Sequence, residues 1–211
     1  MFTLSELFIY ALAAAALVIT PGPGQMLVLA QTASRGRTHG VAASFGLELG
    51  TIAHTVAAAL GLSVILATSA TAFAAVKYIG AAYLVYLGIK ALRERQGEKG
   101  DDKNTQKRTT AVGSILQASL TGVLNPKVAI FFLAFLPQFV HPERGFVLFQ
   151  FLALGLILAF VGFVVDCALT FILHRAGRGF LKNPCFAKWR ARVSGAVLIG
   201  LGARLALTTR D

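Results

Sequence analysis

The chain has 211 residues, of which 56% are hydrophobic and only 14% are charged. Soluble proteins contain about 25% charged residues, so this composition excludes an ordinary soluble domain and indicates an integral membrane protein. The formal net charge of +11 does not indicate nucleic-acid binding, because most basic residues lie in three short segments between apolar runs, where membrane topology calls for Lys and Arg.

Apolar runs of about 20 residues predict membrane-spanning helices, and six such segments follow one another along the chain. The connections between them are short, so we expect an all-α membrane protein with a single domain, residues 1–211, surrounded by membrane lipid. No Lys or Arg precedes the first run, which favours a retained first span over a signal peptide. The predicted spans cover residues 4–32, 41–67, 73–92, 112–140, 146–173 and 193–207.

The first predicted span is interrupted by two prolines and two glycines. Proline lacks a backbone N–H and clashes with the preceding turn, so the helix should break here. A freed helix N-terminus carries partial positive charge and suits a carboxylate, while freed carbonyls suit a cation or an ammonium group. A kink for packing is the simpler alternative, but the clustering favours a substrate-binding role. The predicted substrate-binding residues are Thr20, Pro21, Gly22, Pro23, Gly24 and Gln25.

The second predicted span contains an acidic residue, Glu48. Because a carboxylate facing lipid is unfavourable, we expect Glu48 to bind a substrate ammonium or to carry a proton. Gly46, Gly50 and His54 form a neighbouring stripe, where the small residues allow another helix to approach closely. His54 is a second candidate for proton coupling, and a packed, hydrogen-bonded histidine is the alternative.

Basic residues cluster after the first, third and fifth predicted spans. Because Lys and Arg accumulate in cytoplasmic loops, these three loops are predicted to be cytoplasmic and both termini to lie outside. The polar segment at about 93–111 is expected to be a flexible cytoplasmic linker. The clustered residues are Arg35 and Arg37; Lys90, Arg93, Arg95, Lys99, Lys103, Lys107 and Arg108; and Arg175, Arg178, Lys182, Lys188, Arg190 and Arg192, against Lys77, Arg144 and Arg210 on the other side.

The fourth predicted span is broken by Asn125-Pro126-Lys127. An ionisable residue inside a span marks a functional site by default, so Lys127 either faces a cavity or snorkels to an interface. The linker divides the chain into halves of three spans, at about 4–92 and 112–207. An odd number of spans inverts the second half, which is the inverted-repeat plan of many secondary transporters. We therefore predict that Asn125, Pro126 and Lys127 share the substrate site with the first break.

The fifth predicted span carries a second intramembrane acid, Asp166. Gly162, Asp166, Thr170 and His174 recur every four residues and form one polar stripe. A buried carboxyl group can exchange a proton near neutral pH, which is the property that a proton-coupled carrier needs. A static salt bridge, for example to Lys127, is the alternative.

Other chemistry finds little support in the residues. Cys167 and Cys185 form neither a CxxC pair nor a disulfide framework, and the HExxH, GxSxG and P-loop motifs are absent. We therefore predict that the chain is not an enzyme and has no catalytic residue, cofactor or metal site.

Several short motifs occur together along most of the chain. They are Thr20-Pro21-Gly22-Pro23; Ser34-Arg35-Gly36-Arg37 with Gly40; Gly46-x-x-x-Gly50-x-x-x-His54; Gly80-Ala81-Ala82-Tyr83-Leu84-x-Tyr86-Leu87-Gly88; and Asn125-Pro126-Lys127 with Phe131-Phe132-Leu133 and Leu136-Pro137-Gln138-Phe139. This combination resembles the LysE/RhtB family of amino-acid exporters, and within it the RhtB-like homoserine/threonine efflux branch. Members often have Asn or Asp after the second proline, where this chain has Gly24 and Gln25, a departure that bears on the substrate.

The resemblance implies six helices, an inner-membrane location, homodimers, and export of amino acids or close derivatives driven by the proton gradient. We therefore expect a secondary active exporter of the inner (plasma) membrane with alternating access. The broken helices would hold the substrate carboxylate, and Glu48 or Asp166 would meet its ammonium or the counter-transported proton. The alternatives are an exporter of another small solute or of a metal cation, which Glu48, His54 and Asp166 would ligate, and a non-transporting membrane assembly protein.

Overall fold

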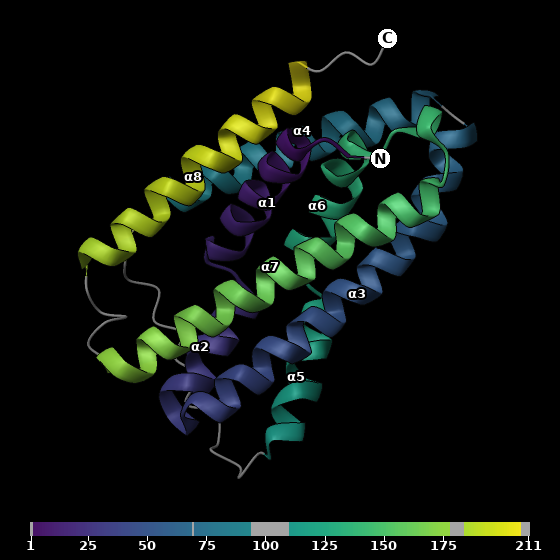
Figure 1. The fold of residues 1–211 in the computed structure, drawn as a ribbon. Coiled ribbons are helices and arrows are strands. Elements are labelled where there is room, and N and C mark those ends of the chain that lie inside the picture. Colours follow the sequence, from purple (N-terminus) through teal and green to yellow (C-terminus); the bar gives the residue numbers. More distant parts are fainter. Residues whose placement is uncertain (1, 69, 94–109, 178–183, 208–211) are drawn as a thin grey trace.

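The computed structural model describes residues 2–68, 70–93, 110–177 and 184–207, and the predicted linker at 93–111 lies almost wholly outside them. The described chain is helical throughout its regular structure (Figure 1). Its elements are α1 (Leu4–Ile19), α2 (Pro23–Arg35), α3 (Arg37–Thr68), α4 (Ala70–Arg93), α5 (Ala111–Val123), α6 (Pro126–Ala134), the 3₁₀ turns η1 (Leu136–Phe139) and η2 (Pro142–Arg144), α7 (Val147–Ala176) and α8 (Pro184–Leu207).

Each predicted span corresponds to one helix or to one broken pair. The two spans predicted to break do so at their prolines, with a bend of 62° between α1 and α2 and of 49° between α5 and the segment Pro126–Phe139. Several helices extend beyond the apolar runs. α8, for example, begins at Pro184 although its apolar run begins at 193, because backbone hydrogen bonding continues through basic residues as readily as through apolar ones.

Length and composition identify the chain as an all-helical membrane protein. Among the described residues, two segments are long and apolar enough to cross a membrane alone, Arg37–Gly61 and Val147–Ala176. Each bent pair adds one further candidate, which gives up to four spans. α4 and α8 contain shorter apolar stretches, Ala81–Lys90 and Ala191–Gly200, so the predicted count of six spans stays a prediction.

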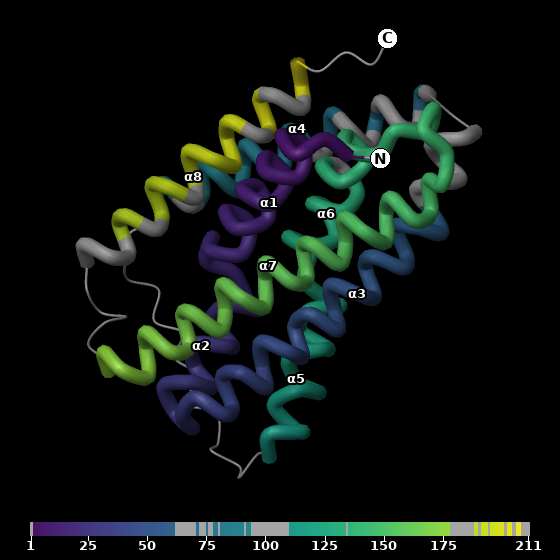
Figure 2. Tube along the Cα trace, in the orientation of Figure 1, coloured from purple at the N-terminus to yellow at the C-terminus, as the bar shows by residue number. Residues whose placement is uncertain are grey.

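Corresponding helices of the two halves lie side by side and run in opposite directions. α3 packs against α7 and α4 packs against α8, and in each pair the chain directions oppose each other (Figure 1). The colour gradient of Figure 2 shows that the first turn of α1 and the last turn of α8 lie towards one end of the bundle. The turn between α2 and α3 lies at the other end, where Gly36 adopts a φ of 86°.

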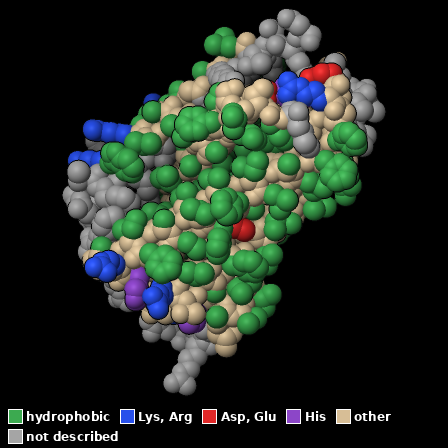
Figure 3. Space-filling model, viewed as in Figure 1, with side chains coloured by type: hydrophobic (Ala, Val, Ile, Leu, Met, Phe, Trp, Pro, Cys, Tyr) green, Lys and Arg blue, Asp and Glu red, His purple; other side chains and the backbone are tan. Residues whose placement is uncertain are grey.

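The outer surface of the bundle is mostly apolar. Figure 3 shows hydrophobic side chains over the face formed by α3 and α7, with Lys, Arg and His side chains gathered where α7 ends and α2 turns into α3. A basic and an acidic side chain lie together at the opposite end, and one small acidic spot is visible midway along the apolar surface (Figure 3). Apolar surface between two polar ends is what a bilayer requires.

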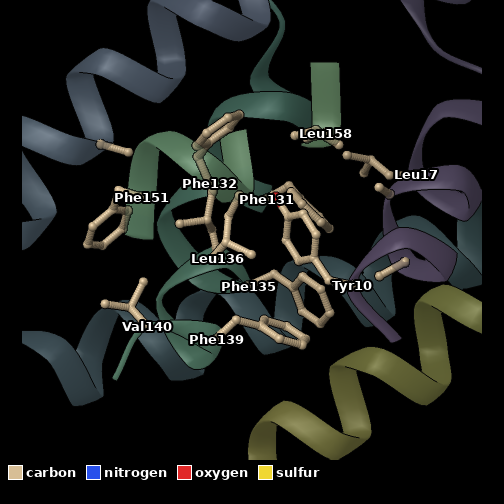
Figure 4. Close-up of a cluster of buried hydrophobic side chains, with 14 of the residues drawn as sticks. Tyr10, Leu17, Phe131, Phe132, Phe135, Leu136, Phe139, Val140, Phe151 and Leu158 are labelled. Atoms are coloured by element: carbon tan, nitrogen blue, oxygen red, sulfur yellow. The ribbon is translucent and has the colours of Figure 1, made fainter. Parts of the chain in front are cut away.

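An aromatic cluster joins the two broken spans. Phe131, Phe135 and Phe139 follow one another at four-residue spacing and surround Tyr10 of α1 (Figure 4), whose ring centroid lies 5.2 Å from that of Phe139 and 6.3 Å from those of Phe131 and Phe135. Aromatic pairs of this kind contribute about 0.5–1.5 kcal/mol each beyond the area they bury. Lipid gives helices no hydrophobic drive to associate, so such packing positions α1 beside α6.

Small residues bring α3 against α5. A Cβ atom added to Gly50 would lie 2.6 Å from the carbonyl carbon of Gly122, and one added to Gly46 would overlap the Ile115 carbonyl oxygen. Neither position tolerates a side chain without a shift of backbone, which confirms the close helix approach predicted for Gly46 and Gly50. α3 therefore lies between α5 and α7, next to both breaks.

Candidate functional site

The first break separates α1 from α2 through three residues. Thr20 is extended (φ −62°, ψ 128°), as expected for a residue before proline, and its side-chain hydroxyl donates to the Ala16 carbonyl at 2.7 Å. Gly22 is the N-cap of α2 and provides no side-chain cap. Pro23 occupies the first helical position, where its missing N–H costs nothing. The N-cap of α2 therefore has no side chain that could bond the backbone N–H groups of the first turn.

Buried side chains bond the carbonyls at the end of α1. Gln25 donates from Nε2 to the Val18 carbonyl at 2.8 Å. Lys127 donates from Nζ to the Leu17 carbonyl at 2.8 Å and to the Thr20 carbonyl at 2.9 Å. Lys127 is 7% exposed, so it faces the interior and does not snorkel to an interface.

The second break is shorter and is capped by its own residues. Asn125 is the N-cap of α6, and its side-chain oxygen accepts the backbone N–H of Lys127 at 3.1 Å. The Asn125 backbone N–H donates to the Gly122 carbonyl at 3.1 Å, a carbonyl that would otherwise face the missing N–H of Pro126.

The two breaks open onto one cavity of about 50 Å³. Both broken spans contribute to its wall, and the unbroken helices α3 and α7 complete it. The lining residues are Leu17, Val18, Gly24, Gln25, Leu47, Glu48, Thr51, Gly122, Asn125, Lys127, Val128, Leu158 and Asp166. The structure therefore brings together six residues that the sequence singled out from four different predicted spans.

The two intramembrane carboxyl groups line the cavity from the neighbouring helices α3 and α7. Glu48 on α3 and Asp166 on α7 are 9% and 2% exposed. Gly162, one turn before Asp166, lies directly against the Glu48 carboxyl group, which a Cβ atom there would overlap. Asp166 Oδ1 is buried and meets no hydrogen-bond partner within the described part of the chain. A buried polar atom without a partner is rare and calls for a functional explanation.

The Lys127 ammonium contacts the carbonyls of α1 and also acts electrostatically on Asp166, so the static Asp166–Lys127 charge pair stays an alternative to proton coupling. His54 lies outside the cavity wall. Its ring is half-buried and stacks on Phe132, with centroids 6.0 Å apart and planes at 28°. Pro21, Pro23 and Pro126 shape the breaks but do not line the cavity. Gly22 lies beside Lys127, and a Cβ atom there would be 3.3 Å from Nζ.

Some lining residues were not predicted. Thr51 lies one turn after Glu48 and shares its helix face, so the helical period alone would have found it. Gly122 and Leu47 have no such signal, because only the contact between α3 and α5 brings them to the cavity. Within the described ranges, no three His, Cys, Asp or Glu side chains are grouped closely enough to hold a metal ion.

Comparisons with known proteins agree with the resemblance seen in the motifs. The LysE type translocator family matches residues 15–209. The uncharacterized membrane protein YrhP of Bacillus subtilis (strain 168) is 34% identical over 210 residues, which cover 96% of this chain and 99% of the relative. The homoserine/homoserine lactone efflux protein of Salmonella typhimurium is 30% identical over 200 residues, which cover 94% of this chain and 95% of the relative. No solved structure matches.

These matches extend over nearly the whole chain, including both breaks and both carboxyl groups. The predicted family resemblance is thereby confirmed, and the matching family consists of translocators, not of enzymes. This membrane protein belongs to the LysE type translocator family.

Proposed function

We propose that the protein is a secondary active exporter of amino acids or close derivatives across the inner membrane, coupled to proton antiport. The observation that carries this proposal is a cavity at which two helix breaks and two buried carboxyl groups meet. A relative named as a homoserine/homoserine lactone efflux protein supports small amino-acid compounds as the substrate class.

The first turn of α2 suits the substrate carboxylate. A helix N-terminus presents N–H groups and partial positive charge, and the N-cap of α2 covers them with no side chain. Gly24 in this turn lines the cavity and has no side chain to cover the backbone. Gln25 and Asn125 border the same space and supply polar groups beside it.

Glu48 and Asp166 suit the substrate ammonium and the proton. Either a proton or an ammonium group can neutralise a buried carboxylate, and the two compete for the same charge. That competition gives antiport, because binding one releases the other on the side that the cavity faces. Asp166, with an oxygen that has no partner in the described chain, is the stronger proton carrier of the two.

The architecture that fits this mechanism has six spans in two inverted repeats. The opposed directions of α3 and α7 and of α4 and α8 support it, as does a break in the first span of each half. We propose repeats at about 4–92 and 112–207, a cytoplasmic linker at about 93–111, both termini outside, and a homodimer in the lipid bilayer. Cysteine labelling from each side of the membrane tests the orientation, and native mass spectrometry from nanodiscs tests the dimer.

The cavity must widen during transport. A volume of about 50 Å³ has room for only a few water molecules, which is less than an amino acid occupies. The breaks are natural hinges for this change, since few backbone hydrogen bonds cross them. We propose that α1 and α2, and α5 and α6, change their bend angles as the cavity opens to one side and then the other.

Proteoliposomes loaded with a panel of radiolabelled amino acids test the function. We expect efflux of at least one small amino acid that rises with an inward proton gradient. Glu48→Gln and Asp166→Asn should lower the gradient-dependent rate about tenfold or more, as loss of a general proton-transfer group does elsewhere, while the exposed control Lys188→Met should leave it unchanged. If no amino acid moves under any gradient, the exporter proposal fails, and if both variants keep gradient-dependent efflux, the carboxyl groups are not the coupling site.

A further inference from the structure

Two prolines remove hydrogen-bond donors from the last turn of α1. In a continuous helix the Leu17 carbonyl would accept the N–H of residue 21, and the Ile19 carbonyl that of residue 23. Both positions are proline and have no N–H. The extended backbone of Thr20 further turns the chain away from the helix. The end of α1 is therefore left with buried carbonyls that need donors from elsewhere.

Those donors come largely from the other half of the chain. Lys127 lies in the first turn of α6, 110 residues from Leu17 and 107 residues from Thr20. Its ammonium group bonds both carbonyls, at 2.8 and 2.9 Å. The absence of a side chain at Gly22, whose added Cβ atom would lie 3.3 Å from Nζ, leaves space for this approach. Asn125 fixes the backbone of Lys127 by accepting its N–H.

The electrostatics favour this arrangement. A helix C-terminus carries partial negative charge, and a cation there is stabilising. A buried ammonium is costly unless it is hydrogen-bonded, and two of the three N–H donors of Lys127 point at carbonyl oxygens. The substrate carboxylate would have to compete with contacts that the protein already makes.

We infer that Lys127 is a positioning residue whose ammonium group caps the C-terminal end of α1, replacing the donors lost at the proline break and fixing the first break against the second, instead of binding the substrate. The statement that Lys127 does not bind the substrate rests on the proposed function. The statement that Lys127 caps the end of α1 is independent of it.

A melting cycle without substrate tests the cap. The wild type, Lys127→Met, Pro21→Ala and the double variant are compared in the same detergent. We expect Lys127→Met to lower the melting temperature by about 5 °C, because buried carbonyls lose charged donors. In the Pro21→Ala background, the decrease in melting temperature caused by Lys127→Met should be about half as large. The reason is that alanine restores the N–H at position 21 and no longer holds Thr20 in the extended conformation. Lys127→Arg should keep most of the stability, and Lys188→Met should keep all of it.

If Lys127→Met lowers the melting temperature equally with Pro21 and with Ala at position 21, the inference that Lys127 caps α1 is overturned. If Lys127→Met gives no folded protein, folding of the double variant supports the cap, and failure of the double variant overturns it. This cycle needs no transport, so its outcome is independent of whether the exporter proposal stands.

Efflux of two related compounds separates positioning from substrate binding. Homoserine has a carboxylate and homoserine lactone has none. A cap predicts that Lys127→Met slows both by the same factor, about tenfold or more, and that Lys127→Arg restores both. A substrate-binding role predicts that the loss is confined to homoserine, which would overturn the inference. If the wild type moves neither compound, the choice of substrate class has failed, and the melting cycle still decides the cap.

Discussion

The two proline breaks occupy the same place in their halves but are completed in different ways. The second break has its own cap, because the Asn125 side chain accepts a backbone N–H of α6 and the Asn125 N–H closes onto the Gly122 carbonyl. The first break bends more, 62° against 49°, and its N-cap, Gly22, offers no side chain. Two of the carbonyls at the end of α1 are bonded by Lys127, from the second half.

The two breaks therefore depend on each other unequally. The second break caps its own helix and also supplies the Lys127 ammonium group to the first break. The first break depends on that ammonium group, and the N-terminus of α2 has no side-chain cap. A change at the second break should therefore disturb both breaks.

The broken spans also meet near the other end of α1. Glu6, in the first turn of α1, contacts His141 in the loop after the second broken span, with Oε1 2.9 Å from Nε2. Gln150 holds this loop against α7 by accepting the His141 N–H and donating to the His141 and Gly145 carbonyls. The aromatic cluster around Tyr10 lies between this contact and the cavity.

Filling the first break should have the largest effect. In Gly24→Leu the side chain would enter the cavity, since an added Cβ atom already lies 3.0 Å from a Leu47 methyl group and 3.6 Å from the Asn125 amide nitrogen. We expect proteoliposome efflux to fall about 100-fold or more, because the substrate loses both space and backbone contacts. Gly61→Leu is the matched control, since nothing lies within 4 Å of a Cβ atom there. Normal efflux in folded Gly24→Leu would place the substrate elsewhere.

Removing the cap of the second break should disturb both breaks. Asn125→Ala loses an N-cap, which costs about 1 kcal/mol and lowers the melting temperature by about 2–4 °C in a chain of this size. Because Asn125 also fixes the turn that carries Lys127, efflux should fall about tenfold. Thr110→Ala removes the equivalent cap of α5, where the side chain accepts the Gly113 N–H, and should lose similar stability but no transport. Equal transport in the two variants would refute the dependence of the first break on the second.

Adding a cap to the first break should affect transport more than stability. Gly22 is extended (φ −167°, ψ 172°), a conformation that serine adopts freely. In Gly22→Ser the hydroxyl can accept an N–H of α2, a gain of a few tenths of a kcal/mol, but its Cβ atom would lie 3.3 Å from Lys127 Nζ and crowd the cap of α1, so the melting temperature should change little. The same hydroxyl would occupy the proposed carboxylate site, so KM for an amino acid should rise about tenfold. An unchanged KM would show that the substrate carboxylate binds away from this N-terminus.

The smallest effect is expected at the loop after the second broken span. The pKa of Glu143 lies below its ordinary value of 4.5, because its carboxylate accepts its own backbone N–H and then because His141 and Arg144 lie nearby. The folded state thus favours the charged form, and its stabilising contribution is present above pH 4.5 and is lost as the pH falls through the lowered pKa. Melting curves of the wild type and Glu143→Gln should therefore separate slightly at pH 7 and converge as the pH falls through the lowered pKa of Glu143. A gap that persists at the lowest pH at which both proteins still fold would assign the difference to packing instead of charge.

Much of the fold followed from local chemistry. Runs of apolar residues predicted where helices lie, and prolines predicted where two of them break, since neither property depends on the rest of the chain. The cavity residues Glu48, Lys127 and Asp166 were visible because ionisable groups are costly inside spans. The helix ends were less predictable, as α8 shows, because a helix does not stop where its apolar residues stop.

The contacts of the site could not be predicted in the same way. His54 was the weaker candidate on the same predicted span as Glu48, and it stacks on Phe132 outside the cavity wall. Lys127 was an equally good candidate for a cavity ligand, an interfacial residue or a salt-bridge partner of Asp166. Which of these holds depends on the position of α1, which packs against α7 and α8 and against the aromatic side chains of α6, more than 100 residues away.

The sequence by itself therefore determined that this is a membrane protein, where its helices lie, where two of them break and which ionisable residues lie within apolar segments. Each of these is a property of one segment. The tertiary structure decided that both breaks and both carboxyl groups share a cavity, and that Lys127 bonds the end of α1. Packing between distant helices makes those choices, since each buried donor and acceptor must find its partner within reach.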